Sequence, residues 1–385
     1  MPLAAAAGFI VLMGQFLVHA ALASDCRHVA ITDASGQAVR GIEDIAVDAA
    51  AKVAYLSADD RWAVEGRASQ GHSVLPQGGI YVLRLDDAAF RSERIAVADA
   101  TTEFKTKNAF HPHGIDLVFD TEGRGTLSVI NRRYQRQNPE RGSGERGGRW
   151  EVVPTVELFD VGDGGTLHHR RTVRSAAFCR ANGVAGLGRE RFLVTNDGTA
   201  CGKWGRRLEQ ALGLKRGNVV LVELEDATEA SAVRTVAGRI GFANGLALDE
   251  QHVYVAATRD QALLVYPRDS LNRAGILDAP ERVIAVGGGP DNLSWASEHL
   301  LLIAVHPSLL RLAAYRYQWM SRLDTAPTRI LAVDVRDGAQ RVVWASDAGE
   351  PLSAATVAVR HEDILIAGSV ADAGLMLCHS STFEN

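Results

Sequence analysis

The segment HVYVAATRDQALLVYP, residues 252–267, contains two short apolar runs separated by a polar turn. Runs of this length, rich in Val, Leu and Tyr and bounded by turn residues, are typical of neighbouring β-strands. Asp-Gly, Gly-Gly and Asn-Gly steps separate many similar runs along the chain. These runs lie at 53–58, 79–85, 127–131, 156–161, 191–197, 218–224, 300–306, 329–335 and 364–369. The pattern predicts an all-β protein.

The length of the chain indicates how these strands are arranged. One short segment, 204–214, has the pattern of an amphipathic helix, and long amphipathic helices are scarce. A blade of a β-propeller takes roughly 50–60 residues, so residues 24–385 accommodate about six or seven blades. A set of β-sandwiches is the alternative, but no clear linker divides the chain. We therefore expect one β-propeller domain.

Two polar insertions interrupt the strand pattern. Residues 60–78 read as a long polar loop, and residues 132–150 are rich in Arg and Gly. A nucleic-acid-binding role for the second insertion is opposed by the net charge of −5, because such proteins are usually basic. We interpret both insertions as surface loops of the kind that often cover a binding site.

The N-terminus and the cysteines indicate export. Residues 2–23 contain no charged side chain and end in Ala-Leu-Ala, which predicts a signal peptide over 1–23, with an uncleaved anchor helix as the alternative. We expect a periplasmic or secreted protein. An even number of cysteines in an exported chain suggests disulfides, with three possible pairings for four residues, while four buried thiols are the other interpretation. The four are Cys26, Cys179, Cys201 and Cys378.

Side chains bearing oxygen stand beside several of the predicted strands. They lie about 50–140 residues apart, and in a toroid such spacing can bring one loop from each of several blades to the central axis. Carboxylate and amide oxygens suit Ca²⁺, which takes six to eight oxygen ligands. Each Asn taken alone is more often a turn residue. The group consists of Glu43, Asp44, Asn182, Asn244, Asp291 and Asn292.

Two histidine segments are further candidates. In His111-Pro112-His113 a histidine could act as general base, or the pair could bind zinc from one face of a strand, although Pro112 disfavours a regular strand. A structural loop histidine is the simpler interpretation. His306-Pro307 follows an apolar run in the same way. The sequence contains no nucleophile elbow, phosphate loop or dinucleotide fingerprint.

Eight segments, taken in order, resemble the paraoxonase/arylesterase family of calcium-dependent lactonases, within the wider senescence-marker and gluconolactonase propellers. They cover nearly the whole chain after residue 23, and the resemblance implies a six-bladed β-propeller with calcium at the bottom of its central pocket. The segments are GIEDIAV (41–47), FHPHGIDLVF (110–119), VELFDV (156–161), RFLVTND (191–197), GFANGLAL (241–248), DNLSWAS (291–297), AVHPS (304–308) and GLMLC (374–378).

The resemblance implies a role for individual residues. His113 matches the family's active-site histidine and is expected to act as general base, and His306 falls at a pocket-lining histidine. Cys26 and Cys378 match a disulfide that joins the termini, and 60–78 matches a mobile active-site loop. The implied ligands of the catalytic calcium are Glu43, Asn182, Asn244, Asp291 and Asn292.

The chain departs from the family at two positions of the site. Arg132 stands where the family has a second, supporting histidine, so the histidine dyad is absent. A second, structural calcium would be held by Asp44 and the carbonyl of Ile115, but Gly183 replaces the Asp that completes its ligands. We expect this second calcium to be held more weakly or not at all.

Together these features predict a calcium-dependent hydrolase of lactones and aryl esters. The metal would bind the substrate carbonyl while water attacks it. The alternatives are a gluconolactonase-like sugar lactonase with a more polar pocket and a non-catalytic, calcium-stabilised binding propeller, because a fold does not determine a function. The expected partner is a small-molecule substrate and not a nucleic acid. Membrane association is expected only if the N-terminal helix is retained.

Overall fold

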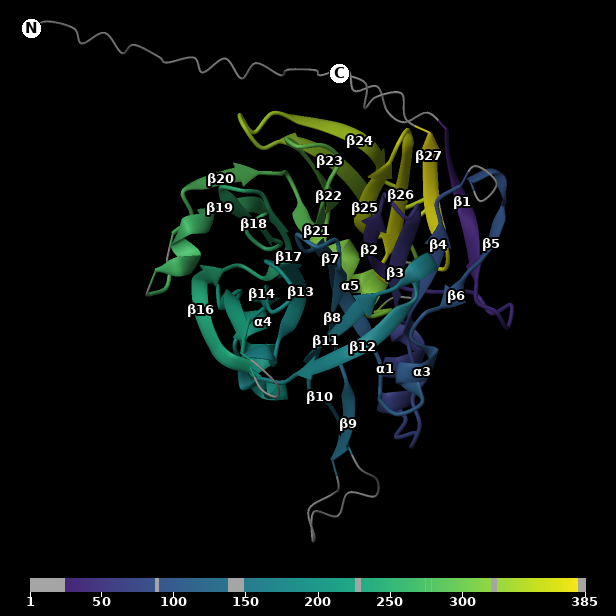
Figure 1. Ribbon diagram of the computed structural model, residues 1–385, viewed down its shortest axis with the longest axis horizontal. Helices are drawn as coiled ribbons and strands as arrows, with labels where there is room; N and C mark the ends of the chain where they lie inside the picture. The colour runs from purple at the N-terminus through teal and green to yellow at the C-terminus, as the bar shows by residue number, and fades with distance from the viewer. Residues whose placement is uncertain are drawn as a thin grey trace, which may run out of the picture.

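The computed structural model describes residues 25–86, 90–137, 149–225, 230–273, 275–277, 279–319 and 324–379. Six sheets stand around a central axis, so the protein is a six-bladed β-propeller (Figure 1). Each innermost strand contacts the innermost strand of the next blade, and the last contacts the first, which closes the ring. These strands are β2 (Ile42–Asp48), β7 (Pro112–Phe119), β13 (Ala181–Gly186), β17 (Ala243–Leu248), β21 (Gly289–Trp295) and β25 (Ala355–His361).

The first five blades are four-stranded antiparallel sheets that follow one another along the chain. Outward from β2 lie β3 (Val53–Ala58), β4 (Gly79–Arg84) and β6 (Ala98–Asp99); outward from β7 lie β8 (Gly125–Asn131), β11 (Thr155–Val161) and β12 (Leu167–Val173). Outward from β13 lie β14 (Arg191–Asn196), β15 (Gly217–Leu224) and β16 (Ala230–Ile240); outward from β17 lie β18 (His252–Ala257), β19 (Ala262–Pro267) and β20 (Arg282–Ala285). The fifth blade adds β22 (Leu300–His306), β23 (Thr328–Asp334) and β24 (Gln340–Ser346) to β21.

The sixth blade combines strands from both ends of the chain. Outward from β25 lie β26 (Ile364–Ser369), β27 (Leu375–His379), β1 (Asp25–Thr32) and the parallel edge strand β5 (Arg94–Ala96). Figure 1 shows purple β1 beside yellow β27. Cys26 stands opposite Cys378 in this antiparallel pair and forms a disulfide with it, while Cys179 pairs with Cys201. The expected covalent closure of the propeller ring is confirmed.

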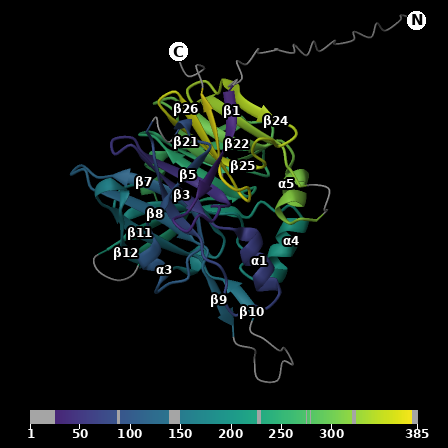
Figure 2. The ribbon, with the colours of Figure 1, turned by 90° about the vertical axis from the view of Figure 1, so that its right-hand side faces the viewer.

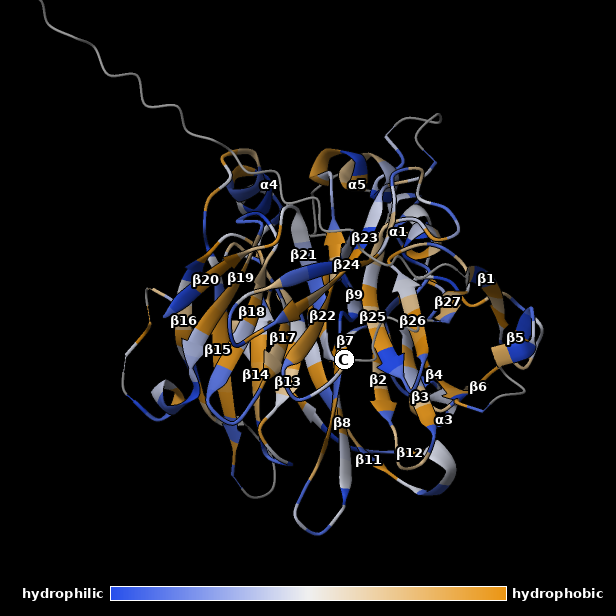
Figure 3. Ribbon diagram, turned by 90° about the horizontal axis from the view of Figure 1, so that it is seen from above, coloured by the Kyte–Doolittle hydropathy of each residue, from blue (hydrophilic) through white to orange (hydrophobic). Residues whose placement is uncertain are grey.

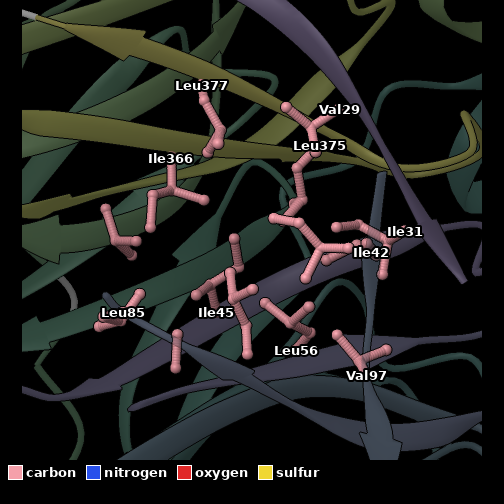
Figure 4. Packing of buried hydrophobic residues seen from close by; sticks show 14 of the residues in the cluster. Val29, Ile31, Ile42, Ile45, Leu56, Leu85, Val97, Ile366, Leu375 and Leu377 are labelled. Carbon is pink, nitrogen blue, oxygen red and sulfur yellow. The ribbon is translucent and has the colours of Figure 1, made fainter. Parts of the chain in front are cut away.

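The hydrophobic core lies between neighbouring blades. Middle strands such as β3, in which every residue from Val53 to Ala58 is buried, have an apolar neighbour on both faces, which explains why they read as continuous apolar runs (Figure 3). The cluster that joins the first and sixth blades includes Ile42, Leu56 and Ile366, together with Leu375 and others (Figure 4). Packing across this seam therefore supports the same closure as the Cys26–Cys378 disulfide.

Helices gather at one end of the propeller. Here α1 (Arg61–Ser69), α4 (Lys203–Ala211) and α5 (Leu309–Arg316) lie around one end of the axis (Figure 2), whereas the short α3 (Thr102–Lys105) lies apart from them. Short 3-10 turns are η1 (Asp163–Gly165), η2 (Ala176–Phe178) and η3 (Arg268–Asn272). None of the described helices is long and apolar enough to cross a membrane. The predicted signal peptide, 1–23, lies outside the described residues.

The two insertions are more regular than the predicted loops. The expectation of a loop over 60–78 was wrong in its first half, because the Asp60 side chain accepts a hydrogen bond from the Ala63 amide at 3.0 Å and begins α1. The 132–150 insertion contains an antiparallel hairpin of β9 (Tyr134–Gln137) and β10 (Arg149–Val152). Residues 138–148 of this insertion lie outside the described part of the chain.

A buried carboxylate joins three strands of the second blade. Glu157 on β11 accepts hydrogen bonds from the Thr155 and Thr172 hydroxyls at 2.5 Å each, and from Asn131 Nδ2 and His169 Nε2 at 3.1 Å each. Burial opposes ionisation of Glu157, but these hydrogen bonds outweigh it and lower its pKa. The network holds the pocket-facing end of β8 in place.

Candidate metal centre and pocket

All six innermost strands share an irregularity at their first residues. The pairing of each with the next strand of its blade shifts register there, as in a β-bulge. A bulge departs from the two-residue alternation of a strand and re-aims side chains. In this way each strand presents polar residues near the axis. The residues at the six bulges are Glu43, His113, Asn182, Asn244, Asp291 with Asn292, and Thr356.

Glycines in three of the six innermost strands, β7, β13 and β17, allow each of these strands to lie close to the next. A Cβ added at Gly114 would lie 2.5 Å from the carbonyl oxygen of Asn182, and one at Gly183 would lie 2.8 Å from that of Asn244. Such distances exclude larger residues unless the backbone moves. The recurring tetrapeptides PHGI, ANGV and ANGL at 112–115, 181–184 and 243–246 therefore mark the site. This repeat is a sequence signal that was overlooked.

A cavity of about 600 Å³ lies at the end of the propeller where these bulges are found. Buried residues of the innermost strands line its inner part, and residues of α1, α4, α5 and the segments that connect the strands line the rest. Four of the five predicted calcium ligands line this cavity: Glu43, Asn182, Asn244 and Asp291. The fifth, Asn292, faces a second cavity instead, and its Nδ2 donates to the Glu43 carbonyl oxygen at 2.9 Å. The structure thus brings four of the five residues to one cavity and places the fifth in contact with Glu43.

Three oxygens of this set have no hydrogen-bond partner within the described residues. They are the buried Asn182 Oδ1 and Asn244 Oδ1, and Glu43 Oε2, which has charge contacts with His113 Nδ1 at 2.9 Å and Arg61 Nη2 at 3.8 Å. A buried acceptor left unpaired costs about 1–3 kcal/mol, so the two amide oxygens, which line one cavity with Glu43 and Asp291, indicate a cationic ligand. The described residues contain no cluster of three or more His, Cys, Asp or Glu side chains with metal-binding geometry, in keeping with a set in which three of the five residues are amides. Oxygen donors of this kind fit Ca²⁺.

Neighbouring side chains orient two of the candidate ligands. Asn244 Nδ2 donates to the Thr258 hydroxyl at 3.2 Å, which directs the amide oxygen away from that contact. Asp291 Oδ2 lies 2.7 Å from His306 Nε2. Burial raises the pKa of Asp291, and the contact with His306 opposes that rise. His306 therefore supports a carboxylate of the set, as residues around metal ligands commonly do.

A guanidinium from α1 reaches His113. Arg61 Nη2 lies 2.5 Å from His113 Nδ1 and 3.8 Å from Glu43 Oε2. Glu43 Oε2 is also 2.9 Å from His113 Nδ1, but it lacks hydrogen-bond geometry, so Arg61 is the donor to this nitrogen. Burial, opposed by Glu43 and reinforced by Arg61, lowers the pKa of His113 to about 4. The imidazole is therefore neutral at pH 7. Arg61 was missed from the sequence because its helix was interpreted as a loop.

Of the remaining candidates, His111 lies away from the cavity and Arg132 lines it. His111 Nδ1 contacts Asp59 Oδ1 at 3.2 Å and its ring packs against Tyr134, whereas His113 faces the cavity. The alternative of a zinc-binding His-x-His pair was therefore wrong. Arg132 lines the cavity on the side of His113.

The residues implied for a second calcium do not fit one. The two Asp44 carboxylate oxygens accept hydrogen bonds from the Ile45 and Ile115 amides at 2.9 and 2.8 Å. Burial and then Glu43 raise the pKa of Asp44 well above its ordinary value. The Ile115 amide thus takes up one Asp44 oxygen, and position 183 has no room for a carboxylate side chain. Asp44 and Ile115 line a separate cavity of about 350 Å³, for which we derive no metal.

Comparison with known proteins places this geometry in context. A sequence model of a family described as Arylesterase matches residues 70–379. Serum paraoxonase/arylesterase 1 of Rattus norvegicus is 26% identical over 297 residues, covering 76% of this chain and 74% of the relative. Serum paraoxonase/lactonase 3 of Oryctolagus cuniculus is 24% identical over 301 residues, with 76% and 74% covered. The solved aldose sugar dehydrogenase of Streptomyces coelicolor superposes with a TM-score of 0.48 at 11% identity, covering 92% of this chain and 96% of that one.

Proposed function

The chain belongs to the arylesterase family, and from this premise we propose that it is a calcium-dependent hydrolase of lactones and aryl esters. Membership of the family supports an ester or lactone hydrolase acting on small molecules. The proposal of calcium dependence rests on one observation: the buried amide oxygens of Asn182 and Asn244 have no hydrogen-bond partner among the described residues, and they line one cavity with the carboxylates of Glu43 and Asp291.

The ion would be held by Glu43, Asn182, Asn244 and Asp291, with Asn292 beside Glu43. When bound, calcium supplies a Lewis acid that favours negative charge on the oxygen of a substrate carbonyl. The protein's own contribution is to fix these donors before substrate arrives. Thr258 does this for Asn244, and His306 does it for Asp291.

His113 is the proposed proton acceptor. Its neutral imidazole has the lone pair at Nδ1, because Arg61 donates to that atom and the ring proton then lies on Nε2. Nδ1 accepts a proton from the attacking water once Arg61 yields its place. Arg61 is thus the partner of His113 before substrate binds, in a chain that has Arg132 where the family has a second histidine, and it keeps the ring proton on Nε2.

We also propose that the protein acts outside the cytoplasm. Two disulfides, Cys26–Cys378 and Cys179–Cys201, are typical of exported proteins. The uncharged segment 2–23 would serve as the signal for export.

The test is hydrolysis of phenyl acetate and of a δ-lactone by chelator-stripped protein to which calcium is returned. Calcium should restore turnover and raise the melting temperature. Glu43→Gln should lower kcat/KM by more than about 100-fold, beyond the range typical of groups that only support a metal ligand. Glu122→Gln, an exposed carboxylate in a surface ion pair, is the matched control and should behave as wild type.

Two outcomes would contradict the proposal. Full activity of Glu43→Gln would remove this residue from the site. Calcium binding with a raised melting temperature but no turnover of either substrate would make the protein a calcium-stabilised binding propeller.

A further inference from the structure

The cavity is lined by an unusual number of positive side chains for a protein whose net charge is −5. They come from α1, α4, α5 and the loops between strands, so residues far apart in sequence converge on one space. The six arginines are Arg61, Arg132, Arg180, Arg206, Arg259 and Arg316.

Carboxylates neutralise only part of this charge. Arg316 pairs with Glu65 at 2.5 Å, and Arg180 pairs with Asp197 and, at 3.3 Å, with Glu209. In the proposed function, Glu43 and Asp291 are committed to the metal. Six guanidiniums then line a cavity whose remaining lining carboxylates are Glu65 and Asp197, with Glu209 beside Arg180, which leaves positive charge in excess inside the cavity.

The excess is concentrated around Arg132. Among the described residues, neither Arg132 nor Arg206 has a carboxylate within ion-pair distance. The charges of Arg180, Arg132 and Arg206 all act on the buried Asp197. Burial and the neighbouring Arg180 and Arg132 lower the pKa of Arg206, and the charges of Asp197 and Glu151 oppose this only in part. Like charges that act on one another in a partly buried site are costly, and an anion bound among them would reduce this cost.

The local structure fixes one of these guanidiniums in place. Arg206 Nε donates to the Cys201 carbonyl at 2.9 Å, and its Nη2 donates to the Cys179 carbonyl at 3.0 Å. The disulfide between these two cysteines holds both carbonyls together. Arg206 is therefore positioned before any ligand binds, and its remaining N–H groups are available. A fixed guanidinium beside a second, unpaired one suits the planar fork of a carboxylate or the oxygens of a phosphate.

We propose that the substrate is an ester or lactone that carries an anionic group, a carboxylate or a phosphate, and that Arg132 and Arg206 bind this group. The inference rests on the proposed function for the reacting end of the substrate. The arginine cluster and the unpartnered oxygens line the same cavity, so one small molecule can contact both. The cluster therefore selects the substrate, whereas the oxygen donors and His113 act on its carbonyl.

A matched pair of esters tests the charge preference. 4-Acetoxybenzoate carries a carboxylate, and its methyl ester is neutral but has the same reacting acetyl group. At low salt the anionic compound should have a kcat/KM higher by about tenfold or more, as expected for charge-assisted hydrogen bonds, and added salt should shrink this advantage. 4-Acetoxyphenyl phosphate as a third substrate distinguishes a phosphate preference from a carboxylate preference.

Variants connect the preference to the arginines. Arg132→Gln should lower the anionic-to-neutral ratio of kcat/KM by about tenfold, and Arg132→Lys should lower it less because the charge remains. Arg124→Gln removes an exposed arginine paired with Asp120 and should leave the ratio unchanged. Equal kcat/KM for the matched esters, or an unaltered ratio in Arg132→Gln, would overturn the inference.

Calorimetric binding of 4-hydroxybenzoate, the phenolic product, separates this inference from the proposed function. If neither ester is hydrolysed but the wild type binds 4-hydroxybenzoate about tenfold more tightly than Arg132→Gln, the hydrolase proposal fails and the anion site stands. If hydrolysis is restored by calcium but 4-hydroxybenzoate does not bind and the esters are equivalent, the anion site fails and the hydrolase stands.

Discussion

Replacing Cys26 and Cys378 together by serine should open the propeller ring at the covalent link between β1 and β27. The two residues are separated by 352 positions in the sequence, and Cys179 and Cys201 by 22. In the chain-entropy description of a cross-link, loops of these lengths correspond to about 6 and about 3.4 kcal/mol of stability at 25 °C. The ring-closing disulfide is therefore expected to contribute about 2.5 kcal/mol more than the local one.

Urea unfolding of the two double serine variants at 25 °C measures this difference. Each variant lacks one disulfide, so Cys179→Ser/Cys201→Ser is the matched control for Cys26→Ser/Cys378→Ser. Opening the ring should also lower the affinity for calcium, because part of the site lies between the first and sixth blades. There the Thr356 hydroxyl of β25 donates to the Glu43 carbonyl of β2 at 2.8 Å. Equal losses of free energy in the two variants, or a larger loss in the control, would refute the reasoning.

Three further changes test the site and its support. Thr258→Val removes the hydroxyl that bonds Asn244, and it should lower calcium affinity about tenfold in calorimetry and cost about 1–3 kcal/mol in urea unfolding. Arg61→Gln removes a positive charge 3.8 Å from the Glu43 carboxylate, so calcium should bind about tenfold more tightly. The same variant loses the contact to His113, which should lower kcat. The pKa of Glu157 is lowered in the folded protein, so its ionised form stabilises the fold above the ordinary glutamate pKa. That contribution should be lost as the pH falls through the lowered value, and Glu157→Gln should flatten the acid limb of a plot of unfolding free energy against pH.

Each of these expectations has a contradicting result. Unchanged calcium affinity in Thr258→Val would mean that the Asn244 amide needs no support. Weaker calcium binding in Arg61→Gln would mean that the guanidinium assists the metal instead of competing with it. An acid limb of the same steepness in wild type and Glu157→Gln would assign acid unfolding to other carboxylates.

The fold could be predicted from the sequence because its signals are local. Short apolar runs such as 252–258 and 263–267 are buried on both faces, so their composition alone identifies them as strands. Cys26 and Cys378 suggested how a ring of such strands could close, although three pairings were open. The α1 helix at 61–69 was missed because its segment is polar and short, and its beginning depends on a cap at Asp60 that resembles turn chemistry.

The candidate site was predictable in composition but not in geometry. The oxygen donors Glu43, Asn182 and Asn244 stood out because their spacing along the chain can bring loops of different blades to one axis. Their directions depend on the bulges, which break the two-residue alternation that a sequence reading assumes. The contact between Arg61 and His113 joins residues 52 positions apart through the fold alone. The arginines of the cavity also come together only through the fold. The net charge of the whole chain, which is negative, gives no sign of them.

A crystal structure of the protein grown with calcium would test the central claim most directly. The account predicts one ion at the inner end of the large cavity, bound by oxygens of Glu43, Asn182, Asn244 and Asp291, with the Arg61 guanidinium moved away from Glu43. An ion bound instead beside Asp44 in the opposite cavity, or fully saturating calcium with no ion among these oxygens, would contradict it.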